Sequence, residues 1–207
     1  MSLNEALERA VSPRFDRLLQ LPIWERLTAG TISRRHYLLL LQQLLQIQLR
    51  LDEALEQRSP LWGLFEPTMC RSEAIARDLA LLGAAASLEL LPATEAAIQI
   101  VRRSSKDPAA LVGCLYVFET LQLHSRSCVK PLASALGMTT IKAARGLDYH
   151  LESVQGIDAR WSRFNEHLDA CGLTFQQPIL EAADATINAL FELYASMCSE
   201  SVEALCA

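Results

Sequence analysis

The segment from Arg34 to Gln57 constrains the fold more strongly than any other part of the sequence. It contains no proline or glycine, it follows Gly30 and the helix-capping Ser33, and it is apolar on most of its surface. A helix that is apolar on most sides is usually surrounded by other helices. The sequence therefore predicts a helical bundle with this segment at its centre.

The residue composition supports the same fold class. Leu and Ala, which favour helices, together number 65, whereas the strand-favouring Val and Ile number 17. Hydrophobic residues make up 51% of the 207 residues and charged residues 21%, which excludes a disordered chain. A chain of this length buries a core without disulfides or a metal. We expect an all-α single domain of about eight helices over residues 1–207.

Apolar periodicity and breaker residues predict the other helices. Pro22 should kink or break the first of them, and Pro131 should bend the helix after Asp107 near Ser127. Residues 59–68 contain two prolines and a glycine and read as an irregular connection. The predicted helices span Ser12–Leu27, Ser72–Leu82, Pro92–Arg102, Asp107–Gly137, Thr139–Leu151, Gly156–Cys171 and Thr174–Glu203.

Charge and cysteine content narrow the function classes. With 24 acidic and 19 basic side chains the net charge is −5, which is not the footprint of a nucleic-acid binder. The longest uncharged stretch, Tyr37–Leu49, is too short to span a bilayer. Six cysteines without a CxxC pair, and an N-terminus Met1–Ala10 without an apolar signal core, predict reduced thiols in the cytoplasm. We expect neither a nucleic-acid partner nor a membrane partner.

Generic active-site motifs are missing from the sequence. None of the four histidines belongs to an HExxH pair or to a zinc-binding spacing. Glu119 and His124 are five residues apart, whereas di-iron bundles use Glu-x-x-His units. There is also no GxSxG motif and no phosphate-binding glycine loop. These patterns predict no metal site and no common catalytic centre.

An ordered series of short motifs carries more information. It consists of RFDRLLQLP at 14–22, AGTIS at 29–33, Tyr37, LDEAL at 51–55, RDLALLG at 77–83, GCLYVFE at 113–119 and WSRF at 161–164. In order and spacing these motifs resemble the heme oxygenase family, whose bacterial members carry RDLxxLG and GxxYVxEG elements. The resemblance extends from about residue 5 to residue 195. It implies a heme oxygenase-like helical fold and oxygen-dependent cleavage of heme to biliverdin, iron and carbon monoxide, with an electron donor as partner.

The resemblance also places a heme pocket, and this sequence departs from the family there. In the family, heme lies between the first helix and a kinked distal helix, a histidine of the first helix ligates the iron, and distal glycines let the backbone approach the porphyrin. Alignment without gaps places Phe15 at the ligand position and Thr120, His124 and Ser125 at the glycine positions. Phenylalanine cannot coordinate iron, and each of the other three adds a side chain where the family leaves room. We expect Phe15 and His124 to face each other across this pocket.

Two pocket residues keep alternative interpretations. His124 either ligates heme iron from the distal face through a neutral imidazole, or fills the space of the heme and bonds to a backbone carbonyl or to Glu119. Glu119 is either a pocket acid that orients water or ligand, or one half of a buried ion pair with a facing helix.

Five arginines could form a basic rim for the heme propionates, as basic side chains do in the family. They are Arg9, Arg14 and Arg17 on the first helix, and Arg160 and Arg163 on a later one. The other interpretation is that they lie on solvated helix faces. The sequence thus predicts a divergent heme oxygenase-like protein with weak or no heme cleavage. The alternative is a non-catalytic protein that keeps the fold and binds a tetrapyrrole, another apolar molecule or a regulatory partner.

Overall fold

The structure is a computed structural model that describes residues 2–57, 63–84, 89–137, 146–154, 156–170, 175–199 and 202. These residues form ten α-helices and two short 3-10 helices and no β-strand, which confirms the all-α fold class. The helices are α1 (Leu3–Leu19), α2 (Pro22–Ala29), α3 (Arg34–Gln57), α4 (Ser72–Leu81), α5 (Pro92–Ser104), α6 (Pro108–Ser125), α7 (Val129–Ala135), α8 (Asp148–Val154), α9 (Ile157–Ala170) and α10 (Gln176–Ser196). The 3-10 helices are η1 (Pro67–Met69) and η2 (Arg126–Cys128). Much of the predicted helix Thr139–Leu151 lies outside the described residues.

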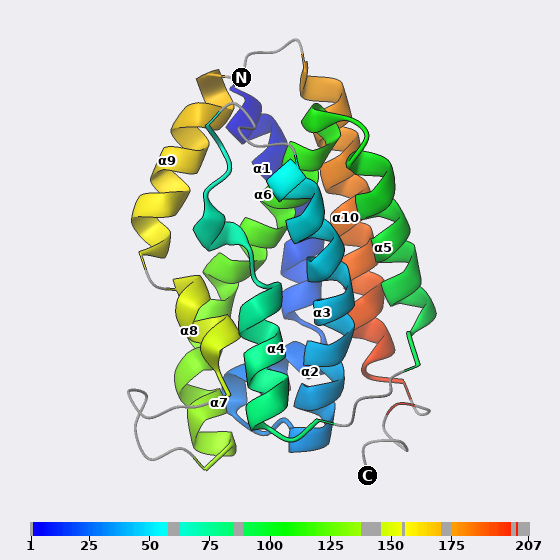
Figure 1. Cartoon of the computed structure of the whole chain (residues 1–207), viewed down its shortest axis with the longest axis vertical. Helices are drawn as coiled ribbons and strands as arrows, with labels where there is room; N and C mark the ends of the chain where they lie inside the picture. The colour runs from blue at the N-terminus through cyan, green and yellow to red at the C-terminus, as the bar shows by residue number, and fades with distance from the viewer. Residues whose placement is uncertain are drawn as a thin grey trace.

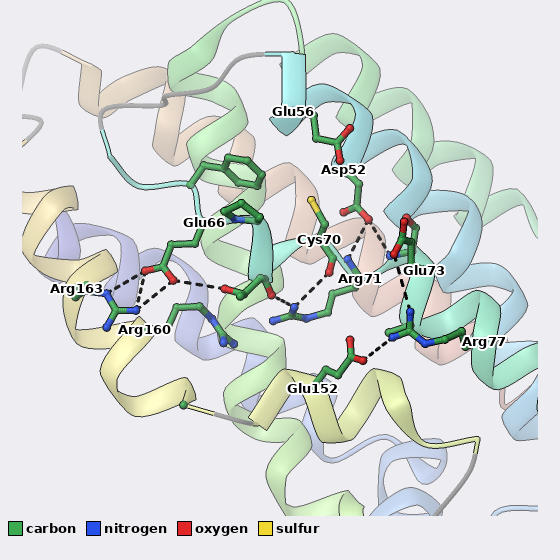
Figure 2. Close-up of a pocket in the computed structure, with 16 residues that line it drawn as sticks. Asp52, Glu56, Glu66, Cys70, Arg71, Glu73, Arg77, Glu152, Arg160 and Arg163 are labelled. Atoms are coloured by element: carbon green, nitrogen blue, oxygen red, sulfur yellow. Dashed lines mark hydrogen bonds and ion pairs between the residues drawn. The ribbon is translucent and has the colours of Figure 1, made fainter.

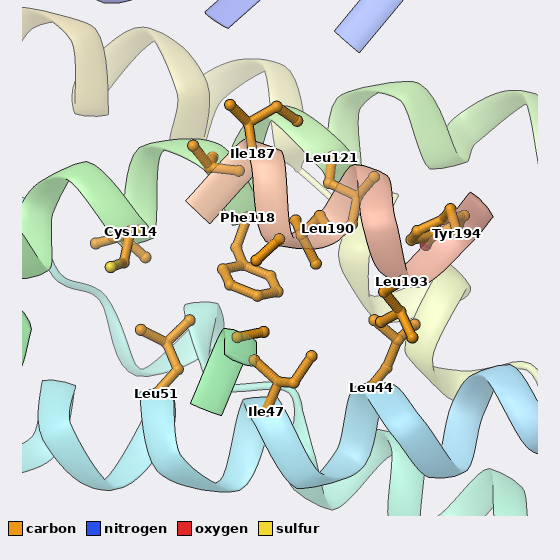
Figure 3. Packing of buried hydrophobic residues seen from close by; sticks show 14 of the residues in the cluster. Leu44, Ile47, Leu51, Cys114, Phe118, Leu121, Ile187, Leu190, Leu193 and Tyr194 are labelled. Atoms are coloured by element: carbon orange, nitrogen blue, oxygen red, sulfur yellow. The ribbon is translucent and has the colours of Figure 1, made fainter. Parts of the chain in front are cut away.

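The bundle is organised around α6 and α10. Helix α10 packs along α6, α1 and α5, while α3 packs on α4 and α5 (Figure 1). Residues 111–119 of α6 are buried without interruption, whereas α3 exposes a face on which Leu49 is 44% exposed. The expectation that Arg34–Gln57 is the central helix is therefore corrected, because residues 111–119 of α6 are buried on every face whereas α3 keeps one exposed face. Leucine and aromatic side chains of α3, α6 and α10 meet in the core (Figure 3).

The first helix begins earlier than the sequence suggested. Helix α1 starts after Ser2, which forms a capping box with Glu5, and it continues through Pro13. Ser12 and Pro13 have the residue types of a helix N-cap and a first helical turn, and for this reason the sequence predicts a start at Ser12. The apolar face of α1 continues across Pro13 and stays buried, and this packing maintains the helix. Pro22 occupies the first turn of α2, which confirms the predicted break.

The predicted helix Asp107–Gly137 is divided into two. Helix α6 ends at Ser125, η2 follows, and α7 begins at Val129. The interruption falls one turn before Pro131, whose missing N–H cannot bond to the carbonyl of Ser127. The predicted bend near Ser127 is confirmed.

Two further sequence expectations concern membranes and thiols. None of the described helices is both long enough and apolar enough to cross a bilayer. The described cysteines are free thiols, and two of them, Cys114 and Cys128, are buried. Cys171 and Cys206 lie outside the described residues.

A buried histidine gives the fold a testable dependence on pH. The His150 ring stacks on Tyr37 at 5.9 Å and meets Tyr149 edge-on at 4.9 Å between centroids. Burial lowers the pKa of His150 from 6.5 to about 4. Between these pH values the unfolded chain binds a proton that the folded chain does not, so acidification removes stability. Burial raises the pKa of Asp78 from 3.8 to about 6, which opposes this trend.

We therefore expect His150→Gln to flatten the acid side of the stability profile. The difference in free energy of unfolding between the native protein and the variant should shift by about 3 kcal/mol from pH 6.5 to pH 4. Urea denaturation at a series of pH values measures this difference, with His167→Gln at an exposed position of α9 as the control. Parallel profiles for the native protein and His150→Gln would contradict the assignment.

Candidate functional site

A crevice of about 280 Å³ lies between α1, α6 and α9, where the resemblance predicts the heme pocket. Its walls are Asn4, Glu8, Ser12, Phe15 and Asp16 of α1, Tyr116, Thr120, Leu123 and His124 of α6, and Trp161 of α9. Three of the five predicted pocket residues, Phe15, Thr120 and His124, thus line one space.

Phe15 and His124 are in direct contact across this crevice. Their ring centroids are 5.5 Å apart and the ring planes are tilted by 34°. Phe15 is buried, whereas His124 is half-buried at the crevice wall. Burial lowers the pKa of His124, and the nearby Asp16 carboxylate partly offsets this effect. The imidazole is therefore neutral at physiological pH, and its ring takes up space between α1 and α6.

Thr120 and Ser125 occupy the other two positions at which the family carries glycine, and their hydroxyl groups form hydrogen bonds within α6. Thr120 Oγ1 donates to the carbonyl of Tyr116 at 2.8 Å, and Ser125 Oγ donates to the carbonyl of Leu121 at 3.0 Å. Ser125 is buried and is not part of the crevice wall. Its predicted place in the pocket is corrected, because the turn of α6 directs it toward the preceding carbonyl.

The third wall of the crevice is aromatic. Trp161 stacks on Phe164 at 5.7 Å within α9, and Tyr116 of α6 lies 5.5 Å from Trp161 and 6.4 Å from Phe164. Through these ring contacts α9 packs against α6. The WSRF motif contributes Trp161 and Phe164, whereas their partner Tyr116 lies on a helix far away in the sequence and is not predictable from motif spacing.

Two of the three arginines of α1 contact α10 instead of the crevice. Arg14 forms an ion pair with Asp184 of α10 at 2.9 Å, and the Arg17 guanidinium lies over the Phe191 ring of α10 at 4.9 Å from its centroid. Arg9 is exposed and lines a surface hollow that shares Glu8 and Ser12 with the crevice, so it lies beside the crevice. Helix periodicity places these side chains on the polar face of α1, but it does not say which neighbour that face meets.

The arginines of α9 also point elsewhere. Arg163 Nη2 lies 2.8 Å from Glu66, and Arg160 is buried beside a second cavity (Figure 2). None of the five predicted rim arginines lines the crevice, and the charged residues that do are Glu8 and Asp16. Four of the five arginines are thus engaged elsewhere, and a role in a propionate rim stays a prediction for Arg9, which lies beside the crevice.

Glu119 belongs to a buried ion cluster on the far side of α6. Arg160 Nε donates to Glu119 Oε2 at 2.8 Å, and Arg71 Nη2 lies 3.8 Å from Glu119 Oε1. The three side chains are 3% exposed. Burial lowers the pKa of Arg71, whereas Glu119 raises it. Glu119 thus has the structural role, with Arg160 rather than His124 as its partner. No sequence motif pointed to Arg71, which directly precedes α4.

Metal ligands do not gather in the described parts of the chain. No group of three or more His, Cys, Asp or Glu side chains there could hold a metal ion. The crevice offers the aromatic rings of Phe15, Tyr116 and Trp161, the His124 imidazole, two carboxylates, and the uncharged polar side chains of Asn4, Ser12 and Thr120. Such a lining suits binding of an apolar or aromatic group more than general acid–base chemistry.

Comparisons with known proteins extend over nearly the whole chain. A family model described as heme oxygenase matches residues 2–200. Among curated proteins, none matches the sequence significantly.

Solved structures of bacterial heme oxygenases share the fold. Heme oxygenase from Leptospira interrogans is 19% identical with a TM-score of 0.81, over 95% of this chain and 100% of that one. Heme oxygenase-1 from Synechocystis sp. PCC 6803, in complex with heme, is 12% identical with a TM-score of 0.84, over 99% and 96%. Heme oxygenase-2 from the same organism, in complex with heme and NO, is 15% identical with a TM-score of 0.85, over 99% and 88%. At these identities the likeness establishes the fold alone.

Proposed function

Because this chain belongs to the heme oxygenase family, we propose that it is a member that keeps the fold and does not cleave heme in the family's manner. It is instead a binding protein whose crevice between α1 and α6 takes an apolar or aromatic ligand smaller than heme. The observation that carries this proposal is the contact of Phe15 with His124, at 5.5 Å between ring centroids. The two rings meet in the space that the resemblance assigns to the porphyrin.

The residues present do not fit heme held as the resemblance implies. Phe15 has no donor atom, and the identity of the axial ligand is a main determinant of heme reactivity. The crevice carries the carboxylates of Glu8 and Asp16, which repel the heme propionates, and none of the five arginines lines it. Its volume of about 280 Å³ is near the lower limit of ligand pockets, about 300–1,000 Å³. These features support a smaller ligand without a carboxylate.

A second candidate function is weak heme binding without turnover. It is favoured by one observation, the half-buried His124 imidazole at the crevice wall, whose pKa is lowered by burial. A neutral imidazole can ligate iron. Such a ligand would occupy the face on which oxygen must bind, so binding by His124 would still exclude efficient cleavage.

A hemin titration followed by absorbance tests the proposal. We expect the native protein to show little specific binding and, with a reductase, to form little biliverdin. Phe15→His alone should restore little, because His124 still fills the distal side. Phe15→His with His124→Gly should bind hemin more tightly than the two single variants together predict, because both positions face one pocket.

The matched control pair is Phe175→His with His167→Gly, which makes the same exchanges at exposed positions. This pair should behave like the native protein. Rapid biliverdin formation by the native protein would overturn the proposal. A sharp six-coordinate spectrum that disappears in His124→Gly alone would favour the second candidate function.

A further inference from the structure

The charged residues in the walls of the crevice are both acidic. Glu8 and Asp16 of α1 line it, and no Lys or Arg side chain does. Both carboxylates are exposed, and neither forms an ion pair or a hydrogen bond with another of the described residues. Arg9 lines the adjoining hollow, which shares Glu8 and Ser12 with the crevice. The crevice therefore presents two negative charges that its own walls do not balance.

These charges act on two other groups of the crevice wall. Burial, and to a smaller extent the Glu8 carboxylate, raise the pKa of Tyr116 to about 12. Burial lowers the pKa of His124 from its usual value of 6.5, and the Asp16 carboxylate opposes this shift. Because its pKa is lowered, the His124 imidazole does not supply a compensating cation at neutral pH. Both carboxylates thus favour a positive charge in the crevice.

The aromatic part of the lining favours the same sign of charge. Trp161 and His124 are half-buried and present ring surface to the crevice, while Phe15 and Tyr116 are buried behind it. The faces of Trp, Tyr and Phe rings carry negative electrostatic potential and attract cations. An aromatic wall beside two carboxylates is therefore suited to a ligand with an apolar body and a positively charged group.

The larger cavity does not show this preference. Its volume is about 850 Å³, and its walls come from α3, η1, α4, α8 and α9 (Figure 2). Arginine and carboxylate side chains both line it, and its arginines are ion-paired, for example Arg163 with Glu66 and Arg77 with Glu152. A ligand of either charge would meet like charges there.

We propose that the ligand of the crevice is a small organic cation, namely a protonated amine on an aromatic or apolar body. This proposal rests on the proposed function, which assigns an apolar or aromatic ligand to the same space, and it adds the charge of that ligand. The ammonium group donates hydrogen bonds to Glu8 and Asp16, whose oxygens accept none from the described residues. The body of the ligand lies against Trp161 and His124. The volume of about 280 Å³ suits a molecule with a single ring.

Calorimetric titration of the full chain with three molecules of similar size tests this proposal. The molecules are phenethylamine, which is protonated at neutral pH, the uncharged phenethyl alcohol and the anionic phenylpropionate. We expect the amine to bind at least about tenfold more tightly than the alcohol, and phenylpropionate to bind more weakly than either. The advantage of the amine should decrease as salt is added, because salt screens exposed charges.

Carboxylate variants identify the groups that hold the ammonium. Glu8→Gln and Asp16→Asn should each weaken binding of phenethylamine about threefold, and the double variant about tenfold, because exposed ion pairs contribute modestly. Binding of phenethyl alcohol should not change. The control pair, Glu95→Gln with Glu192→Gln, removes the same net charge from exposed positions outside the crevice and should leave the binding of both molecules unchanged.

Ring and arginine variants test the other two parts of the argument. Trp161→Leu should weaken binding of both the amine and the alcohol, whereas Trp161→Phe, which keeps a ring, should weaken it less. Circular dichroism spectra of both variants check that α9 is still folded. Arg9→Gln should not weaken binding of phenethylamine, because Arg9 repels a cation.

Equal binding of phenethylamine and phenethyl alcohol would overturn this proposal but not the proposed function, since the crevice would still take an apolar ligand. Tightest binding of phenylpropionate, lost in Arg9→Gln, would overturn it by showing a site for anions beside the crevice. Equal losses in the Glu8 and Asp16 double variant and in the control pair would place the cation elsewhere. Absence of binding by all three molecules would overturn it as well, and the hemin titration decides the proposed function separately.

Discussion

Glu119→Ala is expected to lower the free energy of unfolding by about 3–5 kcal/mol, because it leaves two buried guanidinium groups without their shared carboxylate. Arg160 donates to this carboxylate at 2.8 Å and Arg71 lies 3.8 Å from it, all three side chains being 3% exposed. Removing one member of a buried ion pair leaves an uncompensated charge, which costs far more than the pair itself contributes. Urea denaturation monitored by circular dichroism measures the change.

The control for Glu119→Ala is Glu73→Ala. Glu73 is 94% exposed and lies 3.9 Å from Arg77, so its loss should change stability by no more than about 1 kcal/mol. The double variant Glu119→Leu with Arg160→Leu should lose less stability than the sum of its two single variants. Equal losses for Glu119→Ala and Glu73→Ala would show that the buried cluster does not stabilise the fold.

Gly113→Ala should lower the free energy of unfolding by about 3 kcal/mol, although alanine favours helices. A Cβ at this position would lie 2.2 Å from the Ile179 carbonyl oxygen and 2.9 Å from the Ala183 backbone nitrogen. Both atoms belong to the backbone of α10, so the clash with the new Cβ cannot be relieved by rotation of a side chain. Helices α6 and α10 would have to separate where the core is packed most closely.

Thermal and urea denaturation of Gly113→Ala measure this loss, and Gly156→Ala is the control. Gly156 has a φ of 64° but open space around its Cβ position, so its loss should be limited to about 1–2 kcal/mol from the left-handed backbone. If Gly113→Ala were as stable as the native protein, α6 and α10 could not approach each other as closely as described.

The sequence predicted those features that depend on neighbouring residues. Apolar periodicity located most of the helices, and Pro131 placed the bend near Ser127 because proline acts on its own helical turn. The resemblance to the heme oxygenase family implied that Phe15 and His124 face each other, and the two rings are indeed in contact; the alignment held because each position is counted from motifs nearby in the sequence.

Features that depend on which helix faces which were not predictable in this way. Arg14 and Arg17 were expected at the pocket, but α10 lies against their face of α1. The sequence did not identify the ion-pair partner of Glu119 for the same reason, because Arg71 and Arg160 come from segments far away in the sequence. The start of α1 was misplaced because the local signal of Pro13 was weighed above the continuous apolar face that spans it.

The separation of the crevice from the larger cavity affects how this protein can change over evolutionary time. Neighbouring residues of α9 face different cavities, Arg160 the larger one and Trp161 the crevice, and no residue lines both. A substitution in one cavity therefore leaves the walls of the other intact. The two sites can diverge independently on a single scaffold, so loss of an ancestral chemistry in the crevice does not require loss of whatever the other cavity does.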